Sequence, residues 1–144
     1  MEIKYKKLSE KEYEGAINFS YNEMLSNNQI EDTFKNRTIF IKLNLLKAYD
    51  NLLHLYGAFD NNKLIGVIGY ENDHISILFV NNKYRNNGIA TRLLKHALNY
   101  YIDNDIKTIK LSSTKEALDF YKKFDFLIDE DTNYDKYIPL KREM

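Results

Sequence analysis

The stretch HISILFVNNKYRNNGIATRLLKHAL, residues 74–98, decides the fold. Its first seven residues are mostly apolar and predict a strand, residues 81–84 predict a polar turn, and the 3.6-residue spacing of apolar side chains from Ile89 predicts a helix. The first turn of a helix leaves backbone N–H groups without an acceptor, and Gly88 lacks the side chain that would keep a ligand away from them. Junctions of this kind bind phosphate groups without a metal. The sequence therefore predicts an anionic ligand at residues 85–91.

The chain before this stretch predicts one strand, two helices and a hairpin. Both hairpin strands are apolar almost throughout, so we expect helices to cover both faces of the sheet. The strand at residues 74–80 then continues an antiparallel meander. The predicted elements are a strand at 2–8, a helix opened by the capping box Ser9–Glu12, a helix from near Asp32, and strands at 53–59 and 64–70.

The chain after this stretch predicts a βαβ crossover. The amphipathic helix ends in the polar residues 103–105, and a strand at 106–111 follows, so the strands at 74–80 and 106–111 should run parallel. The sequence thus favours one α+β domain spanning residues 1–144, built on a mixed sheet. The remaining predicted elements are a helix opened by a second capping box at Ser113–Glu116, with Ala117, Phe120, Tyr121 and Phe124 on one face, and a hairpin at 126–131 and 134–140 with Pro139 at an edge or strand end.

Composition excludes several classes of protein and site. The 144 residues contain no cysteine, which excludes a disulfide framework, a thiolate zinc site and a cysteine nucleophile, and agrees with a cytoplasmic location. Lys plus Arg and Asp plus Glu both number 21, so no basic excess points to nucleic acid as a partner. No signal-peptide h-region begins the chain, and no apolar run is long enough for a membrane span.

Two motifs in the right order resemble those of the GCN5-related N-acetyltransferase (GNAT) family. The first, Arg85-Asn86-Asn87-Gly88-Ile89-Ala90, is similar to the family pattern [QR]-x-x-G-x-[GA]. The second, residues 117–126, is similar to the pattern A-x-x-F-Y-x-x-x-G-F, with Asp125 in place of the usual glycine. A left-handed helix end accepts aspartate at some cost. The resemblance covers essentially residues 1–144.

The resemblance implies an acyl-CoA N-acyltransferase fold, with a central mixed sheet of about six to seven strands and about four helices, and acetyl-CoA as co-substrate. It places the pantetheine arm in a gap between the strands at 74–80 and 106–111, where one backbone N–H polarises the acetyl carbonyl. Lys83, Arg85 and Arg92 add positive charge near the phosphates. The implied cofactor-binding residues are Leu78, Phe79 and Val80 beside the thioester, and Arg85, Asn86, Asn87, Gly88, Ile89, Ala90 and Thr91 around the pyrophosphate.

Tyr121 matches the tyrosine that the family uses as the general acid toward the CoA sulfur. A phenol is protonated at neutral pH and can supply that proton; the alternative is an ordinary core tyrosine on an apolar helix face. The spacing of the three histidines predicts no metal site, and His96 is expected on the outer face of its helix. The general base is not identified; Glu71, Asp73, His74 and Ser76 lie near the place where the family often holds a carboxylate.

The resemblance predicts acetyl transfer to a primary amine of a small molecule or peptide, by direct attack in a ternary complex. The loops at 21–31 and 129–137 should select this acceptor. The rival hypothesis is a non-catalytic acyl-CoA-binding or interaction module with the same fold. Homodimerisation through the terminal hairpin or an exposed edge strand is a further expectation. Acidic side chains that either receive a cationic amine or form a solvated surface are Glu23, Glu31, Asp129, Glu130 and Asp131.

Overall fold

The fold is a mixed β-sheet with helices on both faces, and the computed structural model describes residues 2–130 and 136–144. Within these residues the sheet has seven strands in the order β1-β2-β3-β4-β5-β7-β6, accompanied by four α-helices. This confirms the predicted architecture. The elements are β1 (Ile3–Lys7), α1 (Glu10–Ser26), α2 (Phe34–Tyr49), β2 (His54–Asp60), β3 (Lys63–Tyr70), β4 (His74–Val80), a 3-10 turn (Asn82–Tyr84), α3 (Ile89–Asp103), β5 (Thr108–Ser113), α4 (Leu118–Lys122), β6 (Leu127–Ile128) and β7 (Ile138–Glu143).

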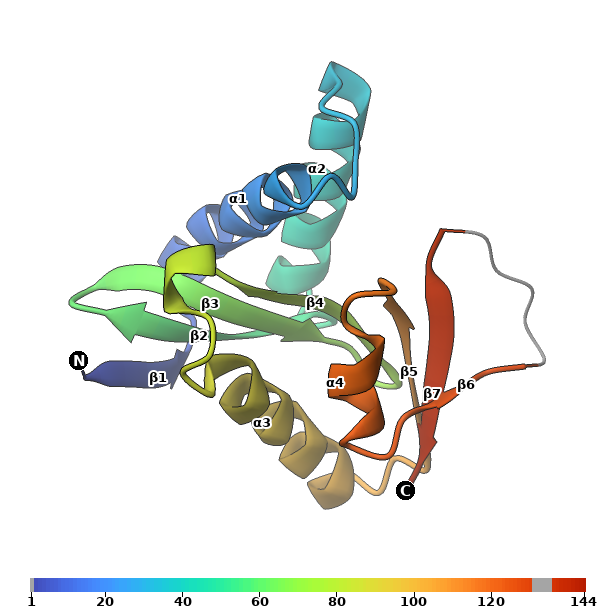
Figure 1. The fold of residues 1–144 in the computed structure, drawn as a ribbon. Helices are drawn as coiled ribbons and strands as arrows, with labels where there is room; N and C mark the ends of the chain where they lie inside the picture. Colours follow the sequence, from blue (N-terminus) through green and yellow to red (C-terminus); the bar gives the residue numbers. More distant parts are fainter. Residues whose placement is uncertain (1, 131–135) are drawn as a thin grey trace.

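Helices cover both faces of the sheet, as the apolar hairpin strands predict. Helices α1 and α2 lie on one face and α3 lies on the other, with α4 beside β5 (Figure 1). One buried cluster joins α1 and α2 to the sheet and includes Ile17, Val67 and Ile77. The second cluster joins α3 and α4 to the opposite face and includes Leu94 and Phe126. The sheet is therefore the middle layer of three.

The first two helices begin at polar caps. The Glu12 carboxylate accepts from the Ser9 backbone N–H at 2.9 Å, in keeping with the predicted capping box. That bond is the main cause of the lowered pKa of Glu12. Helix α2 begins at Phe34, slightly later than predicted, because Thr33 is its N-cap and accepts from the Asn36 backbone N–H at 3.0 Å.

A β-bulge at Ser76 interrupts the pairing of β3 with β4. Tyr70 pairs with Ile75 and Gly69 pairs with Ile77, so Ser76 is the extra residue. In a regular strand, residues two apart share a face. Here Ile75 packs in the α3 cluster and Ile77 packs in the α1 and α2 cluster. The extra residue therefore places these two side chains on opposite faces of the sheet. Bulges bend a strand and raise its local twist.

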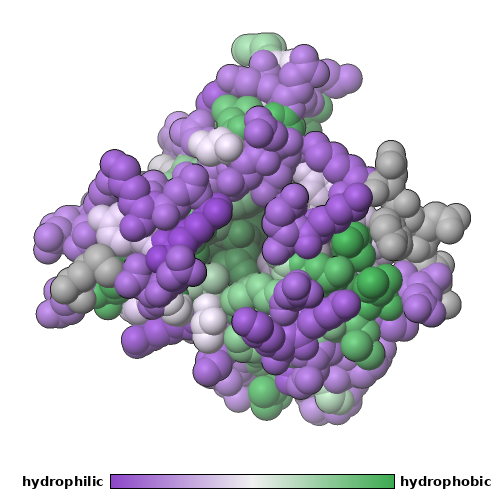
Figure 2. All heavy atoms as spheres, in the orientation of Figure 1, coloured by the Kyte–Doolittle hydropathy of each residue, from purple (hydrophilic) through white to green (hydrophobic). Residues whose placement is uncertain are grey.

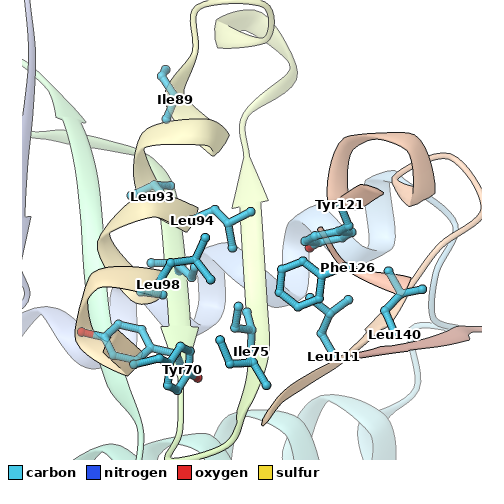
Figure 3. Packing of buried hydrophobic residues seen from close by; sticks show 14 of the residues in the cluster. Tyr70, Ile75, Ile89, Leu93, Leu94, Leu98, Leu111, Tyr121, Phe126 and Leu140 are labelled. Atoms are coloured by element: carbon cyan, nitrogen blue, oxygen red, sulfur yellow. The ribbon is translucent and has the colours of Figure 1, made fainter. Parts of the chain in front are cut away.

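Strands β4 and β5 run parallel, as predicted, but pair over only two positions. The paired residues are His74 with Lys110 and Ile75 with Leu111. Pairing stops at the bulge, so the rest of β4 and the end of β5 diverge. Figure 3 shows Ile75 and Leu111 facing the same buried cluster at this point. The divergence leaves a gap in the middle of the sheet.

The segment from Asp105 to α4 differs from its prediction. The chain leaves α3 through a left-handed residue, Asp105 (φ 59°), so β5 begins at Thr108 rather than at residue 106. Ser113 still pairs with Ile138 as the last residue of β5. The predicted capping box at Ser113–Glu116 is therefore wrong, because sheet pairing holds Ser113 in the strand, and α4 begins only at Leu118.

The terminal hairpin also differs in extent. Strand β6 is only Leu127–Ile128, and β7 begins at Ile138 instead of residue 134. Strand β7 lies between β5 and β6, so it is no edge strand; Pro139 is its second residue, at the strand end as expected. The Pro139 carbonyl accepts from the Asp129 N–H at 2.8 Å. Asp131 and the start of the predicted second strand lie outside the described residues.

Candidate active site in the gap between β4 and β5

A groove with a volume of about 1480 Å³ runs through the gap between β4 and β5. Its walls come from the end of α1 and the residues that follow it, one residue of α2, most of β4, the loop before α3, the end of β5, the segment that leads into α4, α4 itself and the residues just before β7. Figure 2 shows the hollow as an apolar interior surrounded by hydrophilic residues. Nine of the ten residues predicted to bind the cofactor line it, and so does Tyr121.

The loop that precedes α3 turns its backbone toward the groove. Two residues in it adopt left-handed conformations, Asn86 (φ 66°) and Gly88 (φ 73°), and Gly88 is the N-cap of α3. Arg92 N–H is the first helical donor that finds an acceptor, Gly88 O at 3.1 Å. The N–H groups of residues 86–91 have no acceptor among the described residues. They form a donor array at a helix N-terminus, which suits an anion.

Gly88 faces open space. A Cβ built on Gly88 meets no atom within 4 Å, so the protein itself does not require a glycine for packing. The requirement in the free protein is conformational, because positive φ strains other residues. The space beside Gly88 is available to a ligand.

Asn87 is the one predicted cofactor-binding residue that does not line the groove. Its side-chain amide donates to the carbonyls of Tyr84 at 3.0 Å and Arg85 at 3.1 Å, so Asn87 braces the loop from behind. Lys83 and Arg92 also do not line the groove, and the Arg92 guanidinium lies 4.2 Å from the Tyr5 ring centroid. Arg85 does line it.

Arg85 joins this loop to the end of α1. Its Nη2 donates to Asn27 Oδ1 at 3.3 Å. Glu23, one turn earlier, is buried, and its Oε1 has no hydrogen-bond partner among the described residues. Burial raises the pKa of Glu23, and the nearby positive charge of Arg85 opposes that rise.

The register of β3 and β4 determines which backbone groups of β4 face the gap. Asn81 N–H donates to Ile65 O at 2.8 Å, and hydrogen-bonding residues alternate along an antiparallel pair. The N–H and C=O of Phe79 are therefore directed to β3. Those of Leu78 and Val80 point the other way, into the gap from which β5 has diverged. Of the three residues predicted beside the thioester, these two offer backbone donors.

Tyr121 lies at the opposite wall of the groove from β4. Its ring packs edge-on against Phe120 and Phe126, at centroid distances of 5.2 and 5.8 Å, and Figure 3 shows it above Phe126. Its hydroxyl has no hydrogen-bond partner among the described residues. Burial strongly raises the pKa of the Tyr121 phenol. The group is thus a protonated donor held at the groove.

Only Ser76 among the four candidate bases lines the groove. Glu71, Asp73 and His74 form a cluster at the β3–β4 turn, with His74 Nε2 2.8 Å from a Glu71 carboxylate oxygen and His74 Nδ1 3.2 Å from Asp73. The turn lies at the paired end of β4, away from the loop at 85–91. The sequence suggested that Glu71, Asp73 and His74 lie near the site because it does not reveal at which residue β4 and β5 diverge.

The expectation that His96 lies on the outer face of its helix is wrong. The His96 ring stacks on Tyr56 with centroids 3.5 Å apart and planes 3° apart. Its Nε2 lies 3.1 Å from the Tyr70 hydroxyl. Burial lowers the pKa of His96. The residue is part of the packing between α3 and the sheet.

The acidic residues considered for acceptor binding do not reach the groove. Glu23, Glu31, Asp129 and Glu130 are all absent from its walls, and Asp131 lies outside the described residues. Other residues of the two loops predicted to select the acceptor, 21–31 and 129–137, do line the groove, although the sequence singled out none of them, and Phe40 of α2 lies outside every segment predicted for the site. No local pattern marks them, because pairing between distant strands assembles this wall; the most informative are Asn27, Gln29, Phe40, Lys136 and Tyr137.

Comparison with known proteins identifies the family. The sequence profile described as "Acetyltransferase (GNAT) domain" matches residues 8–142. The chain belongs to the GNAT acetyltransferase family. Among curated relatives, the human Cysteine-rich protein 2-binding protein is 36% identical over 76 residues, which are 51% of this chain and 10% of that protein. Uncharacterized protein YxbD of Bacillus subtilis is 36% identical over 75 residues, 49% of this GNAT chain and 47% of YxbD.

Solved structures share the GNAT fold over nearly the whole chain. The PaiA N-acetyltransferase of Thermoplasma acidophilum in complex with coenzyme A has a TM-score of 0.79 at 20% identity, covering 100% of both chains. A predicted acetyltransferase of Clostridium acetobutylicum with acetyl-CoA has a TM-score of 0.80 at 22% identity, covering 93% of this chain and 96% of that one. At these identities the similarity establishes a common fold.

Two further features of this GNAT domain concern metals and membranes. The described residues contain no group of three or more His, Cys, Asp or Glu side chains that could hold a metal ion. Within residues 2–130 and 136–144, no helix has both the length and the apolar character needed to cross a bilayer.

Proposed function

We propose that this protein is an acetyl-CoA-dependent N-acetyltransferase that transfers the acetyl group to a primary amine by direct attack in a ternary complex. One observation carries the proposal: a single groove collects an array of free backbone N–H groups, a strand with unpaired backbone groups and a protonated tyrosine. Each meets one requirement of acyl transfer from a thioester. Family membership and the CoA-bound state of the PaiA relative support the choice of ligand.

The loop at residues 86–91 holds the pyrophosphate. Its free N–H groups and the N-terminus of α3 favour negative charge, and Arg85 adds a cationic side chain at the same wall. Because the donors belong to the backbone, the side chains of Asn86, Ile89 and Ala90 need no special chemistry. Gly88 leaves room for close approach.

The backbone of β4 binds the pantetheine arm and the acetyl group. Leu78 and Val80 offer N–H and C=O groups along the gap, in the pattern by which an added strand pairs. An N–H beside the acetyl carbonyl stabilises the negative charge that develops on its oxygen during attack. The rigid sheet fixes this donor before substrate binds.

The transfer itself forms a nitrogen–carbon bond and breaks the carbon–sulfur bond. The neutral amine attacks the acetyl carbon, its surplus proton passes to a base or to water, the departing thiolate takes a proton from Tyr121, and Tyr121 regains its proton from water. Burial keeps the Tyr121 phenol protonated, so the donor is ready at neutral pH. No acyl-enzyme forms, since the chain has no cysteine and no activated nucleophile lines the described part of the groove.

The rival candidate is an acyl-CoA-binding module without catalysis. Its support is that Glu116 is the only carboxylate lining the described part of the groove, so no evident base faces the acceptor. The test is to incubate the protein with acetyl-CoA and a panel of primary amines and to follow release of the free thiol. Turnover supports the transferase. Tight acetyl-CoA binding without turnover on any amine supports the module, and absence of binding contradicts both.

A further inference from the structure

Residues from both faces of the sheet line the groove. Beyond the bulge, Leu78 and Val80 pack with the α3 cluster, whereas Ile77 and Phe79 face α1 and α2. The loop with free N–H groups lies at the start of α3, so the cofactor occupies the α3 side. The part of the groove that faces α1 and α2 is left for the acceptor.

The α1 and α2 side of the groove has an apolar wall and a polar rim. Met24, Phe40 and Phe79 supply apolar surface, and the residues after α1 supply amide groups. Lys136 and Tyr137, which directly precede β7, stand at the rim. No carboxylate of the described residues lines this side, because Glu116 belongs to the segment that leads into α4.

The rim is held in place by contacts between distant segments. The Gln29 carbonyl accepts from Lys136 Nζ at 2.8 Å and from the Tyr137 hydroxyl at 2.8 Å. Gln29 directly follows the turn after α1, so these bonds tie the end of α1 to the start of β7. An ammonium group carries three N–H donors, so Lys136 retains two for a ligand. The rim therefore presents a fixed positive charge.

The positive charge of Lys136 discriminates between kinds of amine acceptor. A polycation entering here would place ammonium groups beside Lys136, where residues 2–130 and 136–144 supply no carboxylate to compensate them, and like charges in contact cost several kcal/mol. A carboxylate on the acceptor would instead form a charge-assisted hydrogen bond with Lys136. An apolar side chain would pack against Met24, Phe40 and Phe79.

We propose that the acceptor is a small amine that also carries a carboxylate and an apolar side chain, that is, an apolar amino acid or a close analogue, recognised through Lys136. This inference rests on the proposed acetyltransferase function. The product would be an N-acetylated amino acid that keeps its negative charge, together with CoA.

The test compares matched acceptors. Thiol release from acetyl-CoA is measured with L-phenylalanine and L-methionine, with their carboxamides, and with spermidine. We expect the free acids to be used with kcat/KM at least tenfold above the carboxamides, and spermidine to be the poorest. In Lys136→Met the preference for the free acid should disappear, while Lys115→Met, which removes a groove lysine next to α4, should keep it.

The outcomes separate this inference from the proposed function. Efficient use of spermidine, or a carboxamide preferred over its acid, would overturn the acceptor class and leave the acetyltransferase intact. An unchanged acid-to-amide ratio in Lys136→Met would overturn the role of Lys136. Acetyl-CoA binding by calorimetry without turnover on any of the five amines would overturn the acceptor class, and only failure on the wider panel of primary amines would contradict the transferase itself.

Discussion

Ile75 and Leu111 are the last residues that pair between β4 and β5, and everything beyond them on β4 lines a groove. The next residue, Ser76, is the bulge that bends β4 relative to β3. A parallel pair that stops after two positions would leave backbone groups without partners in the middle of the sheet. The pantetheine arm of acetyl-CoA would satisfy them, so the site exists because the sheet is incomplete.

Gly88→Ala should weaken acetyl-CoA binding more than it weakens the fold. The left-handed φ of 73° makes alanine cost about 1–2 kcal/mol in the free protein, and the added Cβ meets no protein atom. In the complex the Cβ enters the space for the pyrophosphate. We expect at least a tenfold rise in the acetyl-CoA Kd, measured by calorimetry. Asn62→Ala, at φ 69° in the β2–β3 turn, is the control, which should lose stability but keep the Kd.

Asp125→Gly should stabilise the protein. Asp125 has φ 68° at the turn after α4, where the family pattern carries glycine. Glycine adopts this conformation without strain, and part of the gain is offset because glycine has more freedom in the unfolded chain. We expect the free energy of unfolding in urea to rise by about 0.5–1 kcal/mol with kcat within twofold of wild type. A loss of stability would show that the Asp125 side chain makes a needed contact.

Tyr121→Phe should lower activity and leave stability unchanged, whereas Tyr101→Phe should lower stability. The Tyr101 hydroxyl lies 2.7 Å from Glu71 O and 3.0 Å from His74 O, so its removal should cost about 1–2 kcal/mol of stability. The Tyr121 hydroxyl bonds to no described residue, so its removal should leave stability near wild type. We expect Tyr121→Phe to lower kcat by about 100-fold without weakening acetyl-CoA binding. Full activity and an unchanged pH profile in this variant would rule out the acid role.

Stability should fall in mild acid because of His96. Burial lowers its pKa in the folded protein, so the unfolded chain binds the proton more readily. The stabilisation is complete above the unfolded-state pKa of about 6.5 and is lost as the pH falls toward the lower folded-state pKa. His96→Phe keeps an aromatic ring against Tyr56 but cannot titrate. Its Tm should fall less than that of wild type between pH 8 and pH 5.5, and equal losses would contradict this account.

Local pattern predicted the elements whose residues contact mainly their own neighbours in sequence. The bounds of β4 are those read from its apolar run, and the 3.6-residue stripe placed α3 correctly. The loop geometry followed from a single glycine and the helix that it opens. The gap between β4 and β5 was predicted from the family resemblance, because the periodicity of apolar residues does not reveal it.

Long-range pairing determined the features that the sequence could not reveal. Ser113 reads as a helix cap, yet pairing with Ile138 keeps it in β5 and shortens α4. The pattern of apolar residues at 75–80 does not predict the β-bulge at Ser76. The sequence predicted a role in acceptor selection for the whole loop at 129–137, but that Lys136 lines the groove follows from the insertion of β7 between β5 and β6.

The most direct test of the proposed site is an amide chemical-shift titration of the ¹⁵N-labelled protein with acetyl-CoA. The account predicts saturable shifts at the amides of residues 86–91 and of Leu78 and Val80, and smaller changes at Phe79, whose N–H is directed to β3. Shifts confined to other surfaces, or no shifts at millimolar acetyl-CoA, would contradict the assignment of the β4–β5 groove as the acetyl-CoA site.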